Sequence, residues 1–384
     1  MKVCVVIGTR PQFIELAPII RELRDIELLE TVIYNTGQHY DAEMSKIFFD
    51  ELDIPPPDKS FGIRPATHAQ QTARIMVATE KQLLLDAPDA LIVEGDTNTA
   101  LGAALAASKL RIPIVHIEAG CRAFDLSLAE EVNRVIISHI ASLHFAPTQN
   151  CLENLVREGI PPSKVYNLGH PLVDAIVSMK SKISLPSRIP ETSHGEEMRL
   201  EKGKYYFVTI HRDHNVDDPY RLSSILSELD RIALSQNDRP LVFAVHPRTQ
   251  KRIRQFRLRE KLRNLAAIKP IGFATSLSLT RHAFATITDS GGLTKESAIL
   301  GTPCVILRPC TEWVEALDGN FAQLAFSRGN NIASCLHMLE KNYDRIRQRG
   351  ATIRDAFGRP GVSKRISRTI ASTDLGLYPN QKLR

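Results

Sequence analysis

The sequence predicts an α/β protein with two domains, each built on a parallel sheet that helices cover on both faces. Short apolar runs recur along the chain, and most of them do not alternate with polar residues, which is typical of strands buried on both faces. Each run leads into a polar cluster and then a helix-like stretch. The 384 residues exceed what one compact core usually holds and suit two domains.

Ten apolar runs are the predicted strands of the two sheets, and they are distributed along most of the chain. They are Val3–Ile7, Thr31–Tyr34, Ala90–Val93, Ile112–Ile117, Leu143–Ala146, Val165–Leu168, Tyr205–Ile210, Leu241–Val245, Phe284–Thr288 and Cys304–Leu307.

Helix start signals follow two of these runs. Thr9 is a suitable N-cap and Pro11 suits the first turn of the helix behind it. The polar string Asp96-Thr97-Asn98-Thr99 opens a second helix, which continues through the alanine-rich segment Ala100–Leu110.

A stretch rich in Ser, Pro, Gly and charge, Ser178–Lys204, interrupts the rhythm of strands and helices and predicts a linker with a decorated loop. We therefore expect an N-terminal domain over residues 1–175, a linker over 176–204 and a C-terminal domain over 205–360. In folds of this kind the last helix often returns to the first domain, so residues 361–384 are expected to pack there.

The composition limits the classes of partner. The net charge is +6, which could reflect nucleic acid, an anionic small substrate or solubility alone. Aromatic residues are only 6% and no nucleic-acid module is visible, which argues against nucleic acid. Six cysteines without a C-x-x-C pair indicate reduced thiols. With no signal peptide or membrane span in the sequence, we expect a cytoplasmic location.

Polar or glycine clusters end most of the predicted strands. In an open parallel sheet, ligands bind outside the carboxyl ends of the strands, so two such sheets facing each other would collect these groups in one cleft. The clusters are Gly8-Thr9-Arg10, Thr36-Gly37-Gln38-His39, Glu94-Gly95-Asp96, Glu118-Ala119-Gly120, His211-Arg212, His246-Pro247 and Asp289-Ser290-Gly291-Gly292.

An anion site is predicted where Ser290, Gly291 and Gly292 open a helix, because backbone N–H groups and the helix dipole favour a phosphate there. The alternative is a tight turn that needs small residues. Glu296, one turn into the helix, could hold a ribose hydroxyl or only complement the dipole. Arg10, at another helix start, could meet the same phosphates or be an ordinary surface arginine.

Three carboxylates, Asp96, Glu118 and Glu131, are candidates for general acid/base chemistry, since crowding and burial can separate their pKa values. The structural alternatives are helix N-capping for Asp96 and an intrahelical pair with Arg134 for Glu131. His211 could titrate near neutrality or be structural. No spacing of these groups indicates a metal site.

An ordered set of short strings resembles the non-hydrolysing UDP-N-acetylglucosamine 2-epimerases. It covers roughly residues 1–320, and it is specific as a set although each string alone is weak. The strings are Gly8-Thr9-Arg10-Pro11, Thr36-Gly37-Gln38-His39, Gly95-Asp96-Thr97, His116-Ile117-Glu118-Ala119-Gly120, Glu130-Glu131-Val132-Asn133-Arg134, His211-Arg212 with Asn215, His246-Pro247, Asp289-Ser290-Gly291-Gly292 with Glu296, and Thr311-Glu312.

The resemblance implies two Rossmann-like domains in the glycosyltransferase-B arrangement, with their parallel sheets facing across a cleft that holds UDP. It implies anti elimination of UDP to a 2-acetamidoglucal and re-addition that inverts carbon 2, with no cofactor and no metal, in a homodimer. By the same resemblance Asp96, Glu118, Glu131 and His211 form the acid/base and sugar site. The nucleotide would be held by Arg10, Ser290, Gly291, Gly292, Glu296 and Glu312.

Several positions depart from the pattern of the best-known members. Those carry Glu and Lys where this chain has Gln12 and Glu15, and Arg-Pro where it has Trp313-Val314. Leu128-Ala129 and Cys121 also differ. Gln12 and the segment around Trp313 resemble a branch that includes epimerases of UDP-2,3-diacetamido-glucuronate.

The sugar therefore has two candidates, plain UDP-N-acetylglucosamine and a diacetamido-uronate derivative. A carboxylate at carbon 6 of the uronate would need cations, for which Arg10, Arg122, Arg134, Arg212 and Arg308 are candidates, although they could equally serve only the diphosphate. Other open interpretations are a hydrolysing epimerase, a glycosyltransferase of the same architecture and a non-catalytic nucleotide-sugar binder.

Overall fold

The computed structural model describes residues 1–38, 52, 54–185, 188–189, 198–235 and 238–375. The chain divides into two compact units. Unit 1 contains Met1–Met179 together with Ala356–Arg384, and unit 2 contains Lys180–Asp355. Each unit has its own parallel sheet, so the predicted fold class of two parallel α/β sheets is confirmed.

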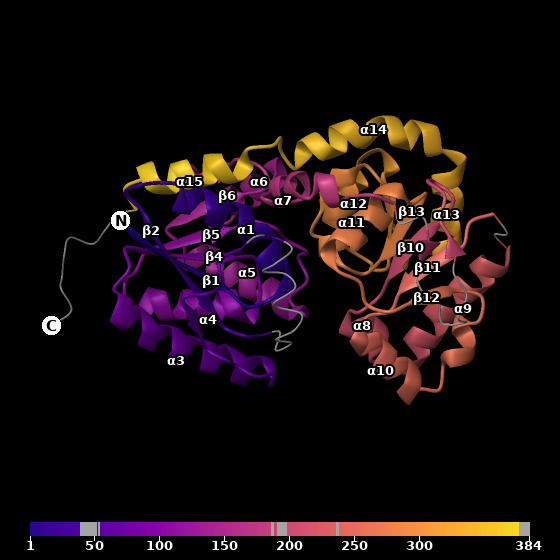
Figure 1. Ribbon diagram of the computed structural model, residues 1–384, viewed down its shortest axis with the longest axis horizontal. Coiled ribbons are helices and arrows are strands. Elements are labelled where there is room, and N and C mark those ends of the chain that lie inside the picture. The colour runs from indigo at the N-terminus through magenta and orange to yellow at the C-terminus, as the bar shows by residue number, and fades with distance from the viewer. Residues whose placement is uncertain (39–51, 53, 186–187, 190–197, 236–237, 376–384) are drawn as a thin grey trace. The chain divides into compact units, whose positions relative to one another are not determined.

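The sheet of unit 1 has seven strands in the order β3-β2-β1-β4-β5-β6-β7, all parallel. The helices α3, α4 and α5 pack on one another, and α1 packs with α7 and α15 (Figure 1). The strands are β1 (Lys2–Ile7), β2 (Glu30–Asn35), β3 (Lys59–Ser60), β4 (Ala90–Glu94), β5 (Ile114–Ile117), β6 (Leu143–Ala146) and β7 (Val165–Asn167). The helices are α1 (Arg10–Arg24), α3 (His68–Asp86), α4 (Asn98–Lys109), α5 (Ala129–Ile140), α6 (Gln149–Arg157), α7 (Leu172–Ser178) and α15 (Val362–Ser372).

The sheet of unit 2 has six parallel strands in the order β12-β11-β10-β13-β14-β15. Its strands are β10 (Tyr206–Thr209), β11 (Leu241–Ala244), β12 (Ala266–Ile268), β13 (Ala285–Thr288), β14 (Cys304–Ile306) and β15 (Ala322–Leu324). Its helices are α8 (Asp213–Val216), α9 (Pro219–Ser235), α10 (Pro247–Gln255), α11 (Phe273–His282), α12 (Gly291–Leu300), α13 (Ile332–Lys341) and α14 (Tyr343–Ala356). A short antiparallel pair, β8 (Arg188–Ile189) and β9 (Met198–Arg199), precedes them.

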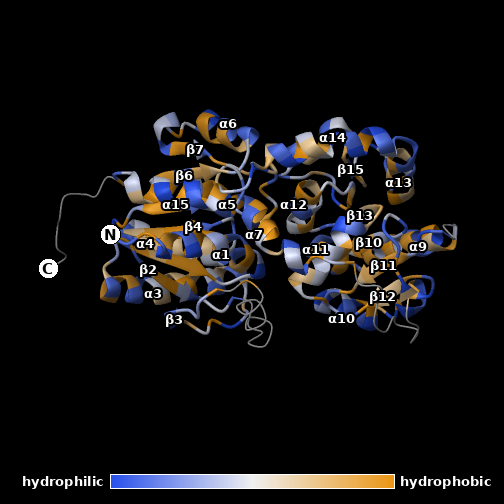
Figure 2. Ribbon diagram, turned by 45° about the horizontal axis from the view of Figure 1, so that its top comes forward, coloured by the Kyte–Doolittle hydropathy of each residue, from blue (hydrophilic) through white to orange (hydrophobic). Residues whose placement is uncertain are grey.

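The central strands of both sheets are buried and apolar, which Figure 2 shows as orange arrows between helices with mixed colouring. In unit 1, side chains such as Val6 and Val93 pack against the small residues of α4. In unit 2, Phe207 and Val242 pack with Leu279. Burial of apolar surface on both faces of each sheet is the main favourable contribution to the folding free energy of such a core.

All ten predicted strands are present, with ends that shift by one or two residues. The expected linker over 176–204 starts inside α7 and includes β8 and β9, and the boundary between the units falls at Lys180. Within the expected terminal segment 361–384, α15 packs against α1 in unit 1, and 376–384 lie outside the described residues. Among the helices that the structure describes, none combines the length and apolarity needed to span a bilayer.

Candidate active site

The carboxyl edge of the unit 1 sheet collects the polar clusters that follow β1, β2, β4 and β5. Gly8 lies so close to two hydroxyls that a Cβ there would come within 2.1 Å of Thr36 Oγ1 and 2.4 Å of Thr99 Oγ1. The two threonine hydroxyls are 2.8 Å apart, and Gln38 Oε1 accepts from the Thr99 N–H at 2.9 Å. His39, the last residue of that predicted cluster, lies outside the described residues.

Gln12 links α1 to the turn after β4. Its Oε1 accepts from the Thr9 N–H at 3.2 Å, and its Nε2 donates to Glu94 O at 3.0 Å and to Thr97 Oγ1 at 3.1 Å. The side chain is fully buried. Gln12 therefore belongs to the support of this edge. Arg10, the first residue of α1, is half-buried.

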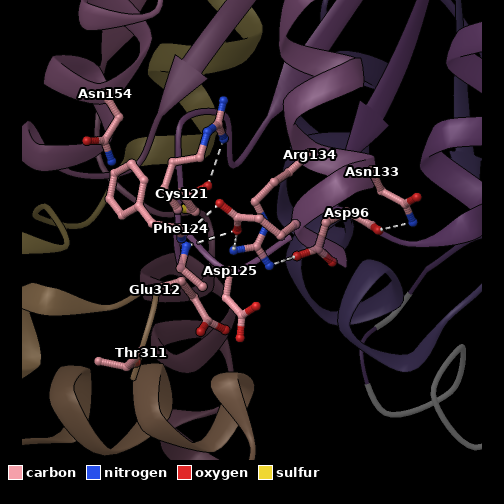
Figure 3. A network of polar contacts seen from close by, with 12 residues as sticks. Asp96, Cys121, Phe124, Asp125, Asn133, Arg134, Asn154, Thr311 and Glu312 are labelled. Atoms are coloured by element: carbon pink, nitrogen blue, oxygen red, sulfur yellow. Dashed lines mark hydrogen bonds and ion pairs between the residues drawn. The ribbon is translucent and has the colours of Figure 1, made fainter. Parts of the chain in front are cut away.

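Asp96 does not cap α4. Thr97 is the N-cap, and its hydroxyl accepts from the Ala100 N–H at 3.1 Å, so the capping alternative for Asp96 is wrong. The Asp96 carboxylate instead accepts from Arg134 Nη2 of α5 (Figure 3). The Asp96 backbone carbonyl accepts from Asn133 Nδ2 at 2.8 Å. Two successive residues of α5 therefore fix the turn that carries Asp96.

Glu131 shares the same guanidinium, since its Oε2 lies 3.2 Å from Arg134 Nη1. The intrahelical pair expected as the structural alternative is therefore present. Its carboxylate also accepts the N–H groups of Ala123 at 2.9 Å and Phe124 at 3.0 Å. Glu131 is 2% exposed, whereas the Asp96 side chain is 23% exposed. Asp96 is thus the more accessible of the two carboxylates, and Glu131 organises the loop before α5.

Glu118 follows β5 with a φ of +62°, a conformation that non-glycine residues rarely adopt. Its Oε2 lies 2.7 Å from His170 Nε2, and its side chain is 10% exposed. The neighbouring His116 on β5 is fully buried and contacts Gly95 O through Nε2 at 3.0 Å. Burial away from water lowers the pKa of His116 to about 3, so this ring is neutral.

Glu15 of α1 points into the same cluster. It is 2% exposed, and its Oε2 lies 3.6 Å from His170 Nε2. One ligand atom each of Glu15, Glu118 and His170 lie within 4.8 Å of one another, a grouping within metal-binding range that no sequence spacing revealed.

The hydrogen bonds of His170 argue against a metal at this cluster. A histidine that binds a metal through Nε2 normally donates its Nδ1–H to an acceptor. Here Nδ1 faces the N–H of Leu172 at 3.1 Å, so it must accept. The ring proton therefore belongs on Nε2, where a metal would have to bind, and the cluster fits a hydrogen bond to a carboxylate better than a cation.

In unit 2, the buried carboxylate of Asp289 fixes the turn after β10. It accepts the N–H of His211 at 3.0 Å, the N–H of Arg212 at 3.0 Å and Asn215 Nδ2 at 3.1 Å. The His211 ring, which is 33% exposed, lies with Nδ1 3.6 Å from Asp289 Oδ1 and stacks at a tilt on His246. His211 is thus held by its backbone while its ring remains accessible.

The helix start predicted as an anion site is present at the carboxyl end of β13. Ser290 is the N-cap of α12, and its Oγ accepts from the Leu293 N–H at 3.3 Å. Gly291 and Gly292 form the first turn, where backbone N–H groups have no partner within the helix. Glu296 is buried farther along α12. A ten-residue helix with this cap provides a dipole end suited to a phosphate.

Glu312 packs directly on the first residue of α12. A Cβ at Gly291 would lie 2.5 Å from Glu312 Oε1, so a larger residue there would displace the Glu312 carboxylate. Glu312 Oε2 accepts from Arg308 Nη1 at 2.7 Å, and both side chains are buried. Next to them the Lys295 ammonium lies 4.8 Å from the centre of the buried Trp313 ring.

Of the residues that support this site, His170 was not predicted from the sequence, and neither were the long-range contacts of Gln12, Arg134 and Asp289. These contacts join residues that are far apart in the chain, such as Gln12 and Thr97, Arg134 and Asp96, or His170 and Glu118, so no local spacing indicates them. For Asp289 a signal existed, because it directly precedes the Ser290-Gly291-Gly292 turn.

Comparison with known proteins finds relatives that cover most of the chain. The family model described as UDP-N-acetylglucosamine 2-epimerase matches residues 21–371. A UDP-N-acetylglucosamine 2-epimerase from Methanococcus maripaludis is 39% identical over 344 residues, which cover 89% of this chain and 92% of that protein. A UDP-2,3-diacetamido-2,3-dideoxy-D-glucuronate 2-epimerase from Pseudomonas aeruginosa is 37% identical over 317 residues, or 82% of this chain and 85% of that one.

Among solved structures, the Methanocaldococcus jannaschii UDP-GlcNAc 2-epimerase in complex with UDP-GlcNAc and UDP superposes with a TM-score of 0.84 at 36% identity. The match covers 97% of this chain and 100% of that one. The resemblance in the ordered motifs, the two parallel sheets and these relatives lead to one conclusion: the chain belongs to the UDP-N-acetylglucosamine 2-epimerase family.

Proposed function

We propose that this enzyme inverts carbon 2 of UDP-N-acetylglucosamine to give UDP-N-acetylmannosamine. The observation that carries the proposal is the set of carboxylates at the carboxyl edge of the unit 1 sheet, in a chain whose 39%-identical relative is named for this activity. In the Methanocaldococcus jannaschii relative, UDP-GlcNAc and UDP are the bound molecules.

The proposed reaction needs a base and an acid but no electron transfer. A base removes the proton from carbon 2, the bond from carbon 1 to the UDP oxygen breaks, and UDP leaves with the electron pair. The resulting 2-acetamidoglucal has a double bond between carbons 1 and 2. UDP then adds back to carbon 1 while an acid delivers a proton to the opposite face of carbon 2.

We assign the proton transfers to the group of Asp96, Glu118, Glu131 and His211. Asp96 and Glu118 suit direct contact with the sugar, because they follow neighbouring strands, β4 and β5, and keep part of their side chains exposed. Glu131 is more buried and supports the loop before α5. Glutamine or asparagine at these positions should lower kcat by about 10²–10⁴-fold, the usual contribution of acid/base catalysis.

The nucleotide is assigned to the start of α12. Ser290, Gly291 and Gly292 offer backbone N–H groups for the diphosphate, and Glu296 and Glu312 are the candidate partners of the ribose and uracil side, with Arg10 as a further phosphate ligand. Because Glu312 already pairs with Arg308 at 2.7 Å, the two would act on the nucleotide as one unit.

A UDP-diacetamido-uronate is the second candidate substrate, favoured by the Pseudomonas aeruginosa relative at 37% identity. The arginines weigh against it. All three guanidinium nitrogens of Arg122 are occupied, by Glu158, Ser138 and the Cys121 carbonyl, and Arg134 and Arg308 pair with carboxylates. Fewer cations thus remain for a carboxylate at carbon 6, which favours the plain sugar.

The test is NMR of each sugar in deuterated solvent without NAD or added metal. We expect exchange of the carbon-2 proton and a C2-inverted nucleotide sugar from UDP-N-acetylglucosamine. Exchange only with the uronate would keep the mechanism and change the substrate. Free UDP with N-acetylmannosamine would indicate a hydrolysing enzyme. Transfer of the sugar to an added acceptor would indicate a glycosyltransferase, and binding without any exchange would indicate a nucleotide-sugar binder.

A further inference from the structure

His170 is a fully buried residue in the turn before α7, and its two ring nitrogens have different partners. Nδ1 lies 3.1 Å from the N–H of Leu172, and Nε2 lies 2.7 Å from Glu118 Oε2. A backbone N–H can only donate, so Nδ1 accepts and carries no proton. The proton is therefore on Nε2, from which the neutral ring donates to Glu118.

The orientation of the ring is fixed by both contacts together. Turning the imidazole over would place carbon atoms against the Leu172 N–H and against the Glu118 carboxylate, and both hydrogen bonds would be lost. A buried N–H or carboxylate without a partner costs about 1–3 kcal/mol, so the observed orientation is strongly preferred.

The C-terminal segment of unit 1 holds this turn in place. The N–H of His170 donates to Phe357 O at 2.7 Å, and the two rings pack at 6.5 Å. Gly169 has a φ of +96°, and a Cβ there would lie 2.9 Å from Phe357 O. His170 is thus a rigid element, which is what a group that positions another side chain requires.

Glu118 needs such a group, because it is strained and has an acidic neighbour. Its φ is +62°, and the carboxylate of Glu15 lies within the same 4.8 Å cluster. Two carboxylates at this separation repel each other where water is largely excluded. His170 Nε2 lies 2.7 Å from Glu118 Oε2 and 3.6 Å from Glu15 Oε2, so its N–H is placed to offset the repulsion between the two carboxylates.

We propose that His170 is a positioning residue for the epimerisation: its Nε2–H holds Glu118 Oε2, which directs Oε1 toward Gly95, next to Asp96. A Cβ at Gly95 would lie 3.8 Å from that oxygen. The inference rests on the proposed function, in which Glu118 transfers a proton of the sugar. Misplacing a reacting group by about 1 Å lowers rates by about 10²-fold.

The test compares two substitutions that each keep one of the two side-chain hydrogen bonds of the histidine. In His170→Gln the side-chain amide reaches the Nε2 position and still donates to Glu118. In His170→Asn the side chain reaches only the Nδ1 position, where its oxygen accepts from Leu172 but nothing donates to Glu118. We expect His170→Asn to lower kcat by about 10²-fold with little change in KM, and His170→Gln to recover most of that loss.

Asp174→Asn is the matched control for general destabilisation. Asp174 lies near the same turn and accepts the N–H groups of Gly361 and Ser363 at 2.7 Å each, without touching Glu118. This variant should unfold at lower temperature and keep a kcat near that of the unchanged chain. A kcat loss that follows thermal stability across the three variants would overturn the positioning role.

Two further measurements separate this inference from the proposed function. Carbon-2 exchange by the unchanged chain and its loss in Glu118→Gln test the function, and if His170→Asn then keeps full kcat, only the inference is wrong. No exchange with either sugar would overturn both. Independently of activity, ¹⁵N-histidine NMR should show a bare Nδ1 and a protonated Nε2 for the resonance missing in His170→Gln; a protonated Nδ1 would contradict the assigned hydrogen bond.

Discussion

Asp96 and Glu131 share the guanidinium of Arg134 but have different surroundings. Glu131 is 2% exposed and holds two backbone N–H groups of the loop before α5, including that of Phe124, whose φ is +55° (Figure 3). Asp96 is bound by the guanidinium and remains partly exposed. At the scale of single residues, one carboxylate therefore maintains a strained loop while the other stays accessible, as the proposed proton transfer requires.

Glu131→Gln should destabilise the protein more than Asp96→Asn does. The single side-chain oxygen of glutamine can accept only some of the hydrogen bonds that the carboxylate accepts. Its NH₂ group would face a backbone N–H, so we expect a loss of about 1–3 kcal/mol in the free energy of unfolding. Urea denaturation of both variants measures it. Equal losses would show that the loop contacts of Glu131 carry no special weight.

Gly291→Ala should weaken UDP binding and lower stability, because the new Cβ would lie 2.5 Å from Glu312 Oε1. Gly292→Ala is the matched variant, since its nearest atom, Ser290 Oγ, would be at an ordinary 3.6 Å. Alanine there should leave stability unchanged or raise it by about 0.5–1 kcal/mol through its higher helix propensity. Thermal unfolding with and without UDP checks both; equal behaviour of the two variants would contradict this account of the helix start.

The candidate groups at strand ends could be predicted, but their partners could not. A parallel sheet places the ends of neighbouring strands together, so the carboxylates after β4 and β5 follow from pattern. No rule of spacing connects Glu15 with His170, because tertiary packing alone joins α1 to the turn before α7. For the same reason the capping interpretation of Asp96 failed: Thr97 was equally suited to cap α4, and the ion pair between Asp96 and Arg134 joins residues far apart in the chain.

At the scale of elements, predictability depended on whether a strand lies inside a recognisable apolar run. The strands inside such runs were anticipated, including β7 and β14 with three residues each. In contrast, β12 holds two alanines, β15 includes the polar Gln323, and β3 has two exposed residues. Strands of this kind form through hydrogen bonds to a neighbouring strand, as β12 does to β11. They have no hydrophobic pattern of their own that marks them in the sequence.

One carboxylate of unit 1 binds the start of the last helix. Asp174 of α7 accepts the N–H of Gly361, the N-cap of α15, and that of Ser363, both at 2.7 Å. Asp174→Ala should therefore cost about 1–3 kcal/mol and increase hydrogen exchange in α15. Exchange mass spectrometry of residues 361–372 measures this, with α13 in unit 2 as the internal reference. Unchanged exchange in α15 would show that its packing on α1 suffices.

At the scale of the whole molecule, the oligomeric state stays a prediction from the family resemblance. Twofold dimers are the commonest assembly of enzymes of this size, and we expect a homodimer. Multi-angle light scattering at micromolar concentration distinguishes a monomer from a dimer, and a mass equal to the 42.9 kDa chain alone would refute the dimer.

Acid stability is a further property of the whole chain, and two buried histidines contribute to it. His116 and His144 are both fully buried. Burial lowers the pKa of His116 to about 3 and also lowers the pKa of His144. In the unfolded chain each ring regains an ordinary pKa of about 6.5. Below that pH the unfolded state binds protons that the folded state excludes, so stability is lost as pH falls.

The contribution of the neutral His116 to the free energy of unfolding is complete above about pH 6.5. It decreases toward pH 3, by up to about 1.4 kcal/mol per pH unit. His116→Gln should remove this slope, because the amide can still donate to Gly95 O but does not titrate. Hydrogen exchange of β4 and β5 between about pH 6 and 4.5 reports the stability of unit 1. Fluorescence of Trp313, the single tryptophan and a residue of unit 2, gives the control. An unchanged slope in β4 and β5, or an equal change at Trp313, would contradict the role given to His116.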